Sequence, residues 1–300
     1  MTDKKKKRKE YPPFTRELAV DSLSRVGLKK GDKVFVHSSL KDLAPAMQLL
    51  KLPNMGMPYL IEGLKEVVGP EGLLCFPTFS YCFATRKTGP TGTIWDRKKT
   101  PSRVGDMTNF FLKGRDVLRS DHPTHSVAAW GAGAEELVAD QGWDSPSTLH
   151  RGGPWGRLCD WDFYIILIGT YMSTCTMVHA VEDWMGLPYL ADAEAVILDE
   201  NKDVRIVTVH GNPGGCREFY NLKETKLERA FQATDIYTTG KLCMADLTLF
   251  KARDFVRFLW QALLDDPWLL LHNDPDDEFC WKSGQAAEKH LAGFSEPCPW

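Results

Sequence analysis

The sequence lacks any apolar run of the roughly 18 to 20 residues that a bilayer-spanning helix needs. It also lacks the hydrophobic stretch of a secretion signal, so we expect a cytoplasmic protein with no membrane association. Its formal net charge is only −3 over 300 residues, which gives no reason to expect a nucleic-acid partner. Hydrophobic residues make up 43% of the chain and charged residues 26%, a composition typical of globular proteins.

Several sequence motifs are also missing. No GxGxxG, Walker or GxSxG motif occurs, so dinucleotide, P-loop nucleotide and α/β-hydrolase chemistry are not favoured. The eight cysteines form no CxxC pair, and they are predicted to be reduced core residues. A set of Cys280, His290 and Cys298 fits no zinc spacing, so we predict no metal site.

Shifts in composition predict three parts of the chain. Residues 1–12 hold the basic run Lys4–Lys9, which predicts a solvated, disordered tail, with a polyanion-binding or targeting segment as the alternative. Residues 13–270 are predicted to form one α/β domain. Residues 271–300 are acidic and aromatic, and we expect this extension to pack loosely on the surface.

Helical and strand-like segments alternate along most of the chain. This order predicts an α/β fold with a central, mostly parallel or mixed sheet flanked by helices. The predicted helices are residues 15–26, 57–68, about 100–113, 134–139, from about 173, and 250–264. The predicted strands are residues 33–36, 73–76, 127–130, 164–168, 193–198, 203–210 and 242–249. Residues 152–157 read as a turn, and residues 81–99 as a binding loop or lid.

The most informative stretch is the predicted strand at 164–168 and the helix that follows it. On a helix, positions three and four apart share a face, so His179, Glu182 and Asp183 should project together. A histidine beside carboxylates, after the end of a buried strand, is an arrangement that general-base chemistry uses. The alternative is an amphipathic helix whose polar face is merely solvated.

Three further segments could contribute to a site. The first strand runs into His37–Leu40, whose hydroxyl and backbone N–H groups suit phosphate or amide groups of a ligand; the alternative is a polar strand end that caps the next helix. Arg103, at the expected start of a helix, predicts an anion site. The turn at 122–126 contains His122 and His125, whose imidazoles could instead bond only to nearby backbone.

Taken in order, a set of short motifs resembles the aminoglycoside 3-N-acetyltransferase family over roughly residues 15–260. The motifs are Val36–Leu40, Pro77–Ser80, Thr100–Gly105, Ser120–Val127, Gly153–Arg157, Ile165–Gly169 and Val178–Glu182. The resemblance implies an acetyl-CoA-dependent N-acetyltransferase with that family's own α/β fold, formed by residues 13–270. It implies a small-molecule amine as substrate, and a homodimer is among the oligomeric states left open.

The resemblance also implies roles for individual residues. His179 matches the family's general base, Glu182 the glutamate that follows it, and His122 a histidine near the reaction centre. Asp96 matches an acidic residue on the side of a cationic substrate, and Asp183 is a second substrate-side candidate. The CoA-binding region is matched by His37, Ser38, Ser39, Leu40, Ser102, Arg103 and Val104.

The implied reaction is direct acetyl transfer to an amino group of an aminoglycoside or similar cationic amine, without a covalent acyl-enzyme. The oxyanion would take hydrogen bonds near Ser38, Ser39 or Ser126. Two departures from the family pattern bear on the substrate: Cys175 to His179 reads Cys-Thr-Met-Val-His instead of Asn-Thr-Phe-Leu-His, and the segment 192–219 is short. The alternatives are an acyltransferase for a different amine in biosynthesis, and a non-catalytic binding protein on the same fold. Antibiotic resistance and biosynthesis both stay open as biological roles.

Overall fold

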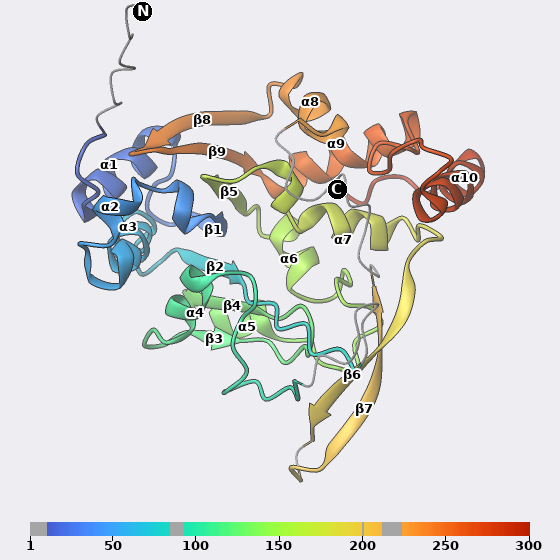
Figure 1. Cartoon of the computed structure of the whole chain (residues 1–300), viewed down its shortest axis with the longest axis horizontal. Coiled ribbons are helices and arrows are strands. Elements are labelled where there is room, and N and C mark those ends of the chain that lie inside the picture. Colours follow the sequence, from blue (N-terminus) through green and yellow to red (C-terminus); the bar gives the residue numbers. More distant parts are fainter. Residues whose placement is uncertain (1–10, 85–92, 200, 212–223) are drawn as a thin grey trace, which may run out of the picture.

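The computed structural model describes residues 11–84, 93–199, 201–211 and 224–300. A seven-stranded sheet with the strand order β3-β4-β2-β1-β5-β9-β8 runs through the molecule, and β6 and β7 form a separate two-stranded sheet (Figure 1). Strand β1 pairs in parallel with β2 and β5, whereas the outer pairs are antiparallel. The predicted mixed sheet is therefore confirmed.

The elements have the following bounds. The strands are β1 (Lys33–Ser38), β2 (Leu73–Pro77), β3 (Leu118–Arg119), β4 (Val127–Gly131), β5 (Tyr164–Ile168), β6 (Ala191–Leu198), β7 (Val204–Gly211), β8 (Tyr237–Leu242) and β9 (Ala245–Lys251). The α-helices are α1 (Arg16–Val26), α2 (Ala46–Leu49), α3 (Met57–Val68), α4 (Asp106–Leu112), α5 (Ala134–Val138), α6 (Pro154–Asp160), α7 (Met177–Trp184), α8 (Lys226–Gln232), α9 (Ala252–Asp265) and α10 (Glu278–Ala292). Short 3₁₀ helices are η1 (Leu40–Asp42), η2 (Pro53–Gly56) and η3 (Met172–Thr174).

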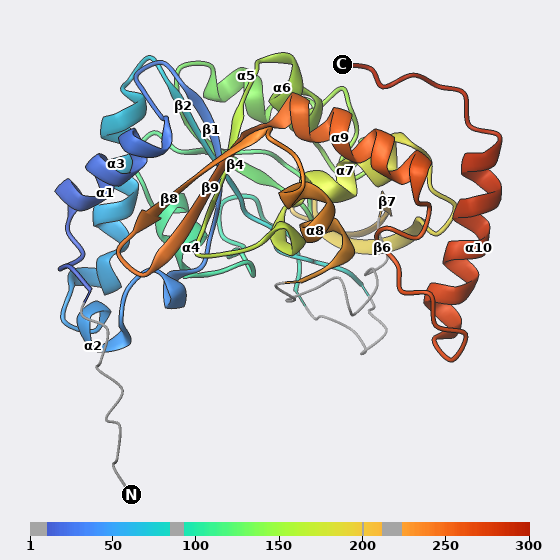
Figure 2. The same ribbon diagram turned by 90° about the horizontal axis from the view of Figure 1, so that it is seen from above.

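Helices cover both faces of the large sheet, so its central strands are apolar on both sides. Val34 and Val36 of β1 face a core cluster that also contains residues of α1, α3 and α4. Phe35 faces a second cluster with residues of α5, α6, α7 and α9. Figure 2 shows α1 and α3 on one side of the sheet and α6, α7 and α9 on the other. Side chains that alternate along β1 and β5 thus separate two cores.

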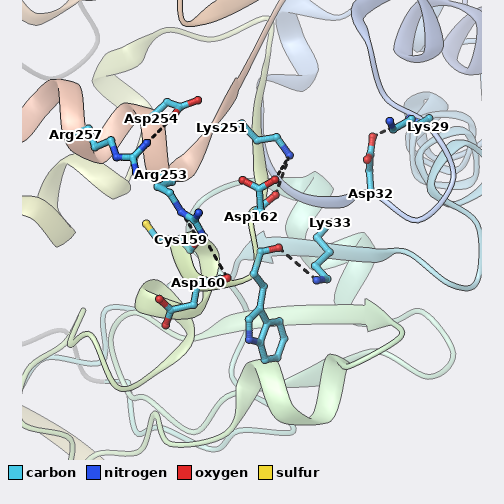
Figure 3. Close-up of polar contacts among 11 residues, drawn as sticks. Lys29, Asp32, Lys33, Cys159, Asp160, Asp162, Lys251, Arg253, Asp254 and Arg257 are labelled. Atoms are coloured by element: carbon cyan, nitrogen blue, oxygen red, sulfur yellow. Dashed lines mark hydrogen bonds and ion pairs between the residues drawn. The ribbon is translucent and has the colours of Figure 1, made fainter. Parts of the chain in front are cut away.

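The carboxyl ends of β1 and β5 lie at the same sheet edge, because Ser38 pairs with Ile168 in their register. At the opposite edge, cations hold the turn that precedes β5 (Figure 3). The ammonium of Lys33 donates to the carbonyl of Trp161 at 3.3 Å, and that of Lys251 contacts a carboxylate oxygen of Asp162 at 2.8 Å. These contacts fix the start of β5, and hence the position from which α7 follows.

Three predicted helix starts were wrong, and a side-chain hydrogen bond accounts for the first of them. The helix expected from Thr100 begins at Asp106, because the backbone N–H of Ser102 bonds to Oδ1 of Asn109 (2.8 Å) and holds the preceding residues in a loop. The helix expected from Ser173 is divided into η3 and α7. Cys175 lies between them with extended backbone dihedral angles, which end the first helical turn.

Two other element predictions were wrong. The turn expected at 152–157 contains the start of α6, whose first residue, Pro154, has the preset φ angle of a helix start. The strand expected at 242–249 is the hairpin of β8 and β9, with Cys243 in the turn at a φ of 52°. Phe250 belongs to β9 and not to the helix after it. The predicted hairpin of β6 and β7 is confirmed, and Glu200 in its turn lies outside the described residues.

The expected loose packing of residues 271–300 is also wrong. Helix α10 buries Cys280 and Leu291 in the core cluster that contains α7 and α9. The indole of Trp300 lies 4.9 Å from that of Trp184 at the end of α7. The acidic composition of this segment did not predict the packing, because only one face of α10 is apolar. The division at residue 270 stays a prediction, and so does the disordered tail at residues 1–12, of which residues 1–10 fall outside the described ranges.

The described parts of the 81–99 segment are attached to β6. The backbone N–H of Ala84 donates to the carbonyl of Glu194 (2.7 Å), and that of Trp95 to the carbonyl of Val196 (2.8 Å). Both flanks of residues 85–92, which are not described, therefore extend the small sheet. Within the described ranges, none of the helices combines the length and the apolar character that crossing a membrane requires.

Candidate active site

Helix α7 brings His179 and Glu182 into direct contact. Nδ1 of His179 lies 2.5 Å from Oε2 of Glu182, and the hydroxyl of Tyr189 donates to the other carboxylate oxygen at 2.6 Å. Glu182 is only 3% exposed, whereas 17% of the His179 side chain reaches the surface. The spacing of three residues on the helix predicted this contact, but Tyr189 lies beyond the helix and carried no sequence signal.

The contact between His179 and Glu182 determines which ring nitrogen can act as a base. A carboxylate opposite Nδ1 favours the tautomer with the proton on Nδ1, because only that tautomer donates to Oε2. The lone pair is then on Nε2. A partly exposed imidazole with a fixed tautomer can accept a proton from a bound substrate, and the buried carboxylate can stabilise the resulting imidazolium.

Asp183 does not share the contact between His179 and Glu182. Its carboxylate accepts a hydrogen bond from the hydroxyl of Ser147. Burial raises the pKa of Asp183, while the Ser147 hydrogen bond and the nearby imidazoles of His210 and His150 oppose that rise. The predicted substrate role of Asp183 stays a prediction.

His122 is 1% exposed and acts as a hydrogen-bond acceptor within its own turn. Its Nδ1 faces the backbone N–H groups of Thr124 (3.3 Å) and His125 (3.2 Å), so Nδ1 carries the lone pair and Nε2 the proton. Burial lowers the pKa of His122 to about 3. This geometry corresponds to the alternative in which the imidazole bonds to nearby backbone, and a catalytic role for His122 stays a prediction.

His37, from the predicted CoA-binding loop, is buried in the same way. It is 6% exposed, its ring lies 5.1 Å from that of Phe35, and burial lowers its pKa to about 3. Its Nε2 is a buried atom with no hydrogen-bond partner among the residues that the structure describes. Leaving such a group unpaired typically costs about 1 to 3 kcal/mol, so this nitrogen is a candidate for contact with a ligand.

The low pKa values of His37 and His122 predict acid sensitivity. Both imidazoles stay neutral in the folded chain while the unfolded chain takes up protons below pH 6.5. The free energy of unfolding should therefore fall by about 2 kcal/mol per histidine between pH 6.5 and pH 5. Urea unfolding at the two pH values measures this loss. The His122→Asn variant keeps an acceptor for the turn and should lose less stability on acidification than the wild type; an unchanged difference would contradict the assignment.

The rest of the predicted CoA-binding loop makes mainly local bonds. The hydroxyl of Ser39 donates to Asp42 at 2.5 Å, and its backbone N–H donates to the carbonyl of Ile168 at 2.9 Å. Ser38 is the last residue of β1 and Leu40 the first of η1. The Ser39 hydroxyl bonds to the side chain of Asp42 and makes no capping bond to a backbone N–H of η1. The alternative in which the strand end caps the following helix and the binding of CoA by this loop both stay predictions.

Ser102, Arg103 and Val104 lie in the loop before α4. The hydroxyl of Ser102 accepts bonds from Thr108 (2.8 Å) and from the backbone N–H of Val104 (3.2 Å). The guanidinium of exposed Arg103 donates to Thr93 at 3.0 Å. Because α4 starts at Asp106, Arg103 is not in its first turn, and the argument from a helix start does not apply. Binding of CoA phosphates here stays a prediction.

Asp96 and Ser126 each have local partners. Asp96 accepts bonds from the backbone N–H groups of Lys98 (2.9 Å) and Lys99 (3.2 Å), and a quarter of its side chain is exposed. The hydroxyl of Ser126 donates to the carbonyl of Thr78 at 2.9 Å. Ser126 therefore uses its proton within the fold, which weakens its case as an oxyanion donor. A substrate role for Asp96 stays a prediction.

Arg119 is an organising residue that the sequence did not reveal. It donates to the carbonyls of Thr100 (2.5 Å) and Thr78 (2.6 Å) and to the hydroxyl of Ser126 (3.0 Å). Its guanidinium also lies 4.5 Å from the ring centre of Trp95. Burial lowers its pKa to about 10, so it is still a cation at neutral pH. Arg119 thereby connects the residues after β2 to the loop that precedes α4.

Other buried polar atoms resemble Nε2 of His37. The hydroxyl of Ser173 in η3 and the indole nitrogen of Trp155 in α6 are among those buried with no hydrogen-bond partner in the described part of the chain. Trp155 packs against Phe35, with ring centres 5.4 Å apart, and Met172 beside Ser173 belongs to the same core cluster. These three groups therefore lie on the α7 side of the sheet. A separate surface hollow lined by Asp116, Leu118 and α5 lies beside β3 and β4 and contains none of them.

Comparison with known proteins agrees with these features. The family described as aminoglycoside 3-N-acetyltransferase matches residues 35–263. Aminoglycoside N(3)-acetyltransferase IV from Salmonella sp is 27% identical over 256 residues, which cover 84% of this chain and 88% of the relative.

Solved structures show the same fold. Aminoglycoside acetyltransferase AAC(3)-IVa, solved as the apoenzyme, has a TM-score of 0.75 and 24% identity, over 94% of this chain and 100% of that chain. A binary complex of AAC-IIIb with CoASH has a TM-score of 0.69 and 20% identity, over 84% of this chain and 96% of that chain.

Proposed function

The chain belongs to the aminoglycoside 3-N-acetyltransferase family, and we propose that it transfers the acetyl group of acetyl-CoA to an amino group of an aminoglycoside or a similar cationic amine. The observation that carries the proposal is the 2.5 Å contact between partly exposed His179 and buried Glu182. The relative solved with CoASH supports CoA as the carrier of the acetyl group. A cytoplasmic location and a homodimer stay predictions.

His179 removes the proton that otherwise prevents attack. Most aliphatic amines are protonated at neutral pH, and an ammonium has no lone pair with which to attack a thioester. Nε2 of His179 accepts one proton from the ammonium, and the neutral amine nitrogen then forms a bond to the acetyl carbon. The carbon–sulfur bond breaks, and the second proton that the nitrogen loses goes to the departing CoA thiolate, while the imidazolium returns its proton to solvent. The transfer is therefore direct and no acyl-enzyme forms.

Glu182 and Tyr189 keep the base ready for this step. The buried carboxylate faces Nδ1 of His179 and stabilises the positive ring that forms during transfer. The Tyr189 hydroxyl, 2.6 Å from the second carboxylate oxygen, restrains the carboxylate in that orientation. Tyr189 is therefore proposed as a positioning residue that acts through Glu182.

The oxyanion of the tetrahedral intermediate needs hydrogen-bond donors near the acetyl carbonyl. We assign this role to the unpartnered groups on the α7 side of the sheet, Nε2 of His37 and the hydroxyl of Ser173. The hydroxyls of Ser39 and Ser126 are less suitable, because each already donates within the fold. The same unpartnered groups support a fit between this sheet edge and the acyl end of CoA.

Thiol release tests the proposed function. The purified chain should release CoA thiol from acetyl-CoA when an aminoglycoside is present, and not when the same aminoglycoside lacks its 3-amino group. Release only with polyamines or amino-nucleosides would show that the substrate is one of these amines and not an aminoglycoside. No release with any amine would contradict the enzyme and favour the non-catalytic binding protein.

A further inference from the structure

The segment that connects α9 to α10 brings three metal-ligand side chains together. Ligand atoms of His272, Asp277 and Cys280, one from each residue, all lie within 4.8 Å of one another. The group lies at the end of the molecule opposite α1 and α3 (Figures 1 and 2). It is separate from the contact between His179 and Glu182, with which it shares no residue.

The burial of the three side chains distinguishes them from an exposed acidic patch. Cys280 is fully buried, and the side chains of His272 and Asp277 are 17% and 33% exposed. One sulfur, one imidazole nitrogen and one carboxylate oxygen form a donor set that suits zinc, whereas magnesium and calcium prefer oxygen ligands alone.

The spacing suits a tetrahedral ion. Nε2 of His272 lies 3.2 Å from Oδ2 of Asp277. Two such ligands, each about 2.0 to 2.1 Å from zinc, are about 3.3 to 3.4 Å apart in a tetrahedron. A sulfur ligand of the same ion lies about 3.5 Å from each of them, and Sγ of Cys280 is within 4.8 Å of both.

Asp277 can bind a metal without losing its present role. It is the N-cap of α10, where Oδ1 accepts the backbone N–H of Cys280 at 3.0 Å, while Oδ2 faces His272. Cys280 lies in the first turn of the helix that Asp277 caps.

We propose that His272, Asp277 and Cys280 bind one zinc ion through Nε2, Oδ2 and Sγ, with water as the fourth ligand. The thiol of Cys280 loses its proton to solvent when the zinc–sulfur bond forms, and no oxidation occurs. Spacing along the sequence predicts no metal site, because Cys280, His290 and Cys298 do not have the spacing of zinc ligands. In the fold, His290 faces the carbonyl of Met185 at 2.8 Å instead.

The ion would fasten the start of α10 to the loop that precedes it. This helix also contacts α7, because Met185 is the C-cap residue of that helix. Trp268 packs so closely on Gly284 that an added Cβ would approach its ring to 2.2 Å, so α10 has little freedom to shift.

Cobalt(II) and zinc titrations of the metal-free full-length protein test the site. Cobalt should produce a thiolate-to-cobalt charge-transfer absorption that zinc abolishes. The band should disappear in Cys280→Ser and persist in the control Cys243→Ser, which changes a cysteine at the turn between β8 and β9. Absence of the band in the wild type, or its persistence in Cys280→Ser, would overturn the proposal.

A second variant tests the site even if Cys280→Ser does not fold. His272→Gln keeps the thiol and should weaken zinc binding by at least about tenfold, measured by competition with a chelator. Zinc should raise the melting temperature of the wild type and of Cys243→Ser, and raise it less in His272→Gln. Equal zinc affinity in His272→Gln and wild type would contradict the site. None of these measurements depends on acetyl transfer.

Discussion

Replacing His179 with alanine is expected to lower the rate of acetyl transfer by about 100-fold to 10,000-fold, the typical contribution of a positioned general base. Without the imidazole, the amine must lose its proton to bulk water before it attacks the thioester. The affinity for CoA should change little, because the binding of CoA does not require the imidazole of His179. The rate of thiol release at saturating acetyl-CoA, together with CoA binding by calorimetry, separates the two effects.

The control for this substitution is His150→Ala, which removes an imidazole that bonds to the carbonyl of Asp140 at 2.7 Å. That variant should keep its turnover within about threefold of the wild type. If His179→Ala also stays within about threefold, His179 is not the base. A loss of CoA affinity equal to the loss of rate would instead indicate a damaged fold.

Tyr189→Phe provides a graded companion to His179→Ala. It removes the 2.6 Å hydrogen bond to Glu182 but keeps the ring and the base. The expected loss of kcat is smaller than for His179→Ala, with KM for the amine unchanged and the pH profile of kcat displaced. A merely structural tyrosine would lower stability and leave the pH profile in place.

The features that the sequence predicted are those decided by local spacing. His179 and Glu182 meet because they are three residues apart on one helix, and this geometry depends on nothing distant in the chain. Strands β1 and β5 were recognised because buried central strands are continuous apolar runs. The family resemblance then added an order of motifs that no single segment contains.

The features that the sequence missed depend on side-chain contacts that hydrophobic periodicity and helix propensity do not encode. Ligand atoms of His272 and Cys280 lie within 4.8 Å of each other across a turn in which the backbone N–H of Asp277 donates to the carbonyl of Asp274 at 3.1 Å. Helix α10 appeared to be a surface extension because an acidic composition does not reveal its apolar face. The helix expected from Thr100 starts late because Asn109 bonds to the backbone of Ser102, and helix propensity does not include such a bond.

The contacts of Arg119 are the clearest example of contacts that local spacing cannot reveal. Replacing Arg119 is expected to cause the largest loss of stability. Arg119→Leu should lower the free energy of unfolding by about 3 kcal/mol. Its charge-assisted hydrogen bonds to the carbonyls of Thr78 and Thr100 disappear, and hydrogen bonds to charged groups contribute about 1.5 to 3 kcal/mol. The contact with the ring of Trp95, of the order of 1 kcal/mol, is lost as well. Urea denaturation followed by far-ultraviolet circular dichroism measures the change.

Arg115→Leu is the matched control, because the Arg115 side chain is 95% exposed and forms a surface ion pair with Asp116. Such pairs contribute about 0 to 1 kcal/mol, so the control should retain nearly all of its stability. Equal effects of the two substitutions would show that Arg119 does not organise the loops at 78–80 and 96–100. These loops contain or adjoin Asp96, a predicted substrate-binding residue, and Ser102, a predicted CoA-binding residue. If Arg119 holds the loops in place, Arg119→Leu should also weaken the binding of CoA or of the amine, measured at temperatures where the variant is fully folded.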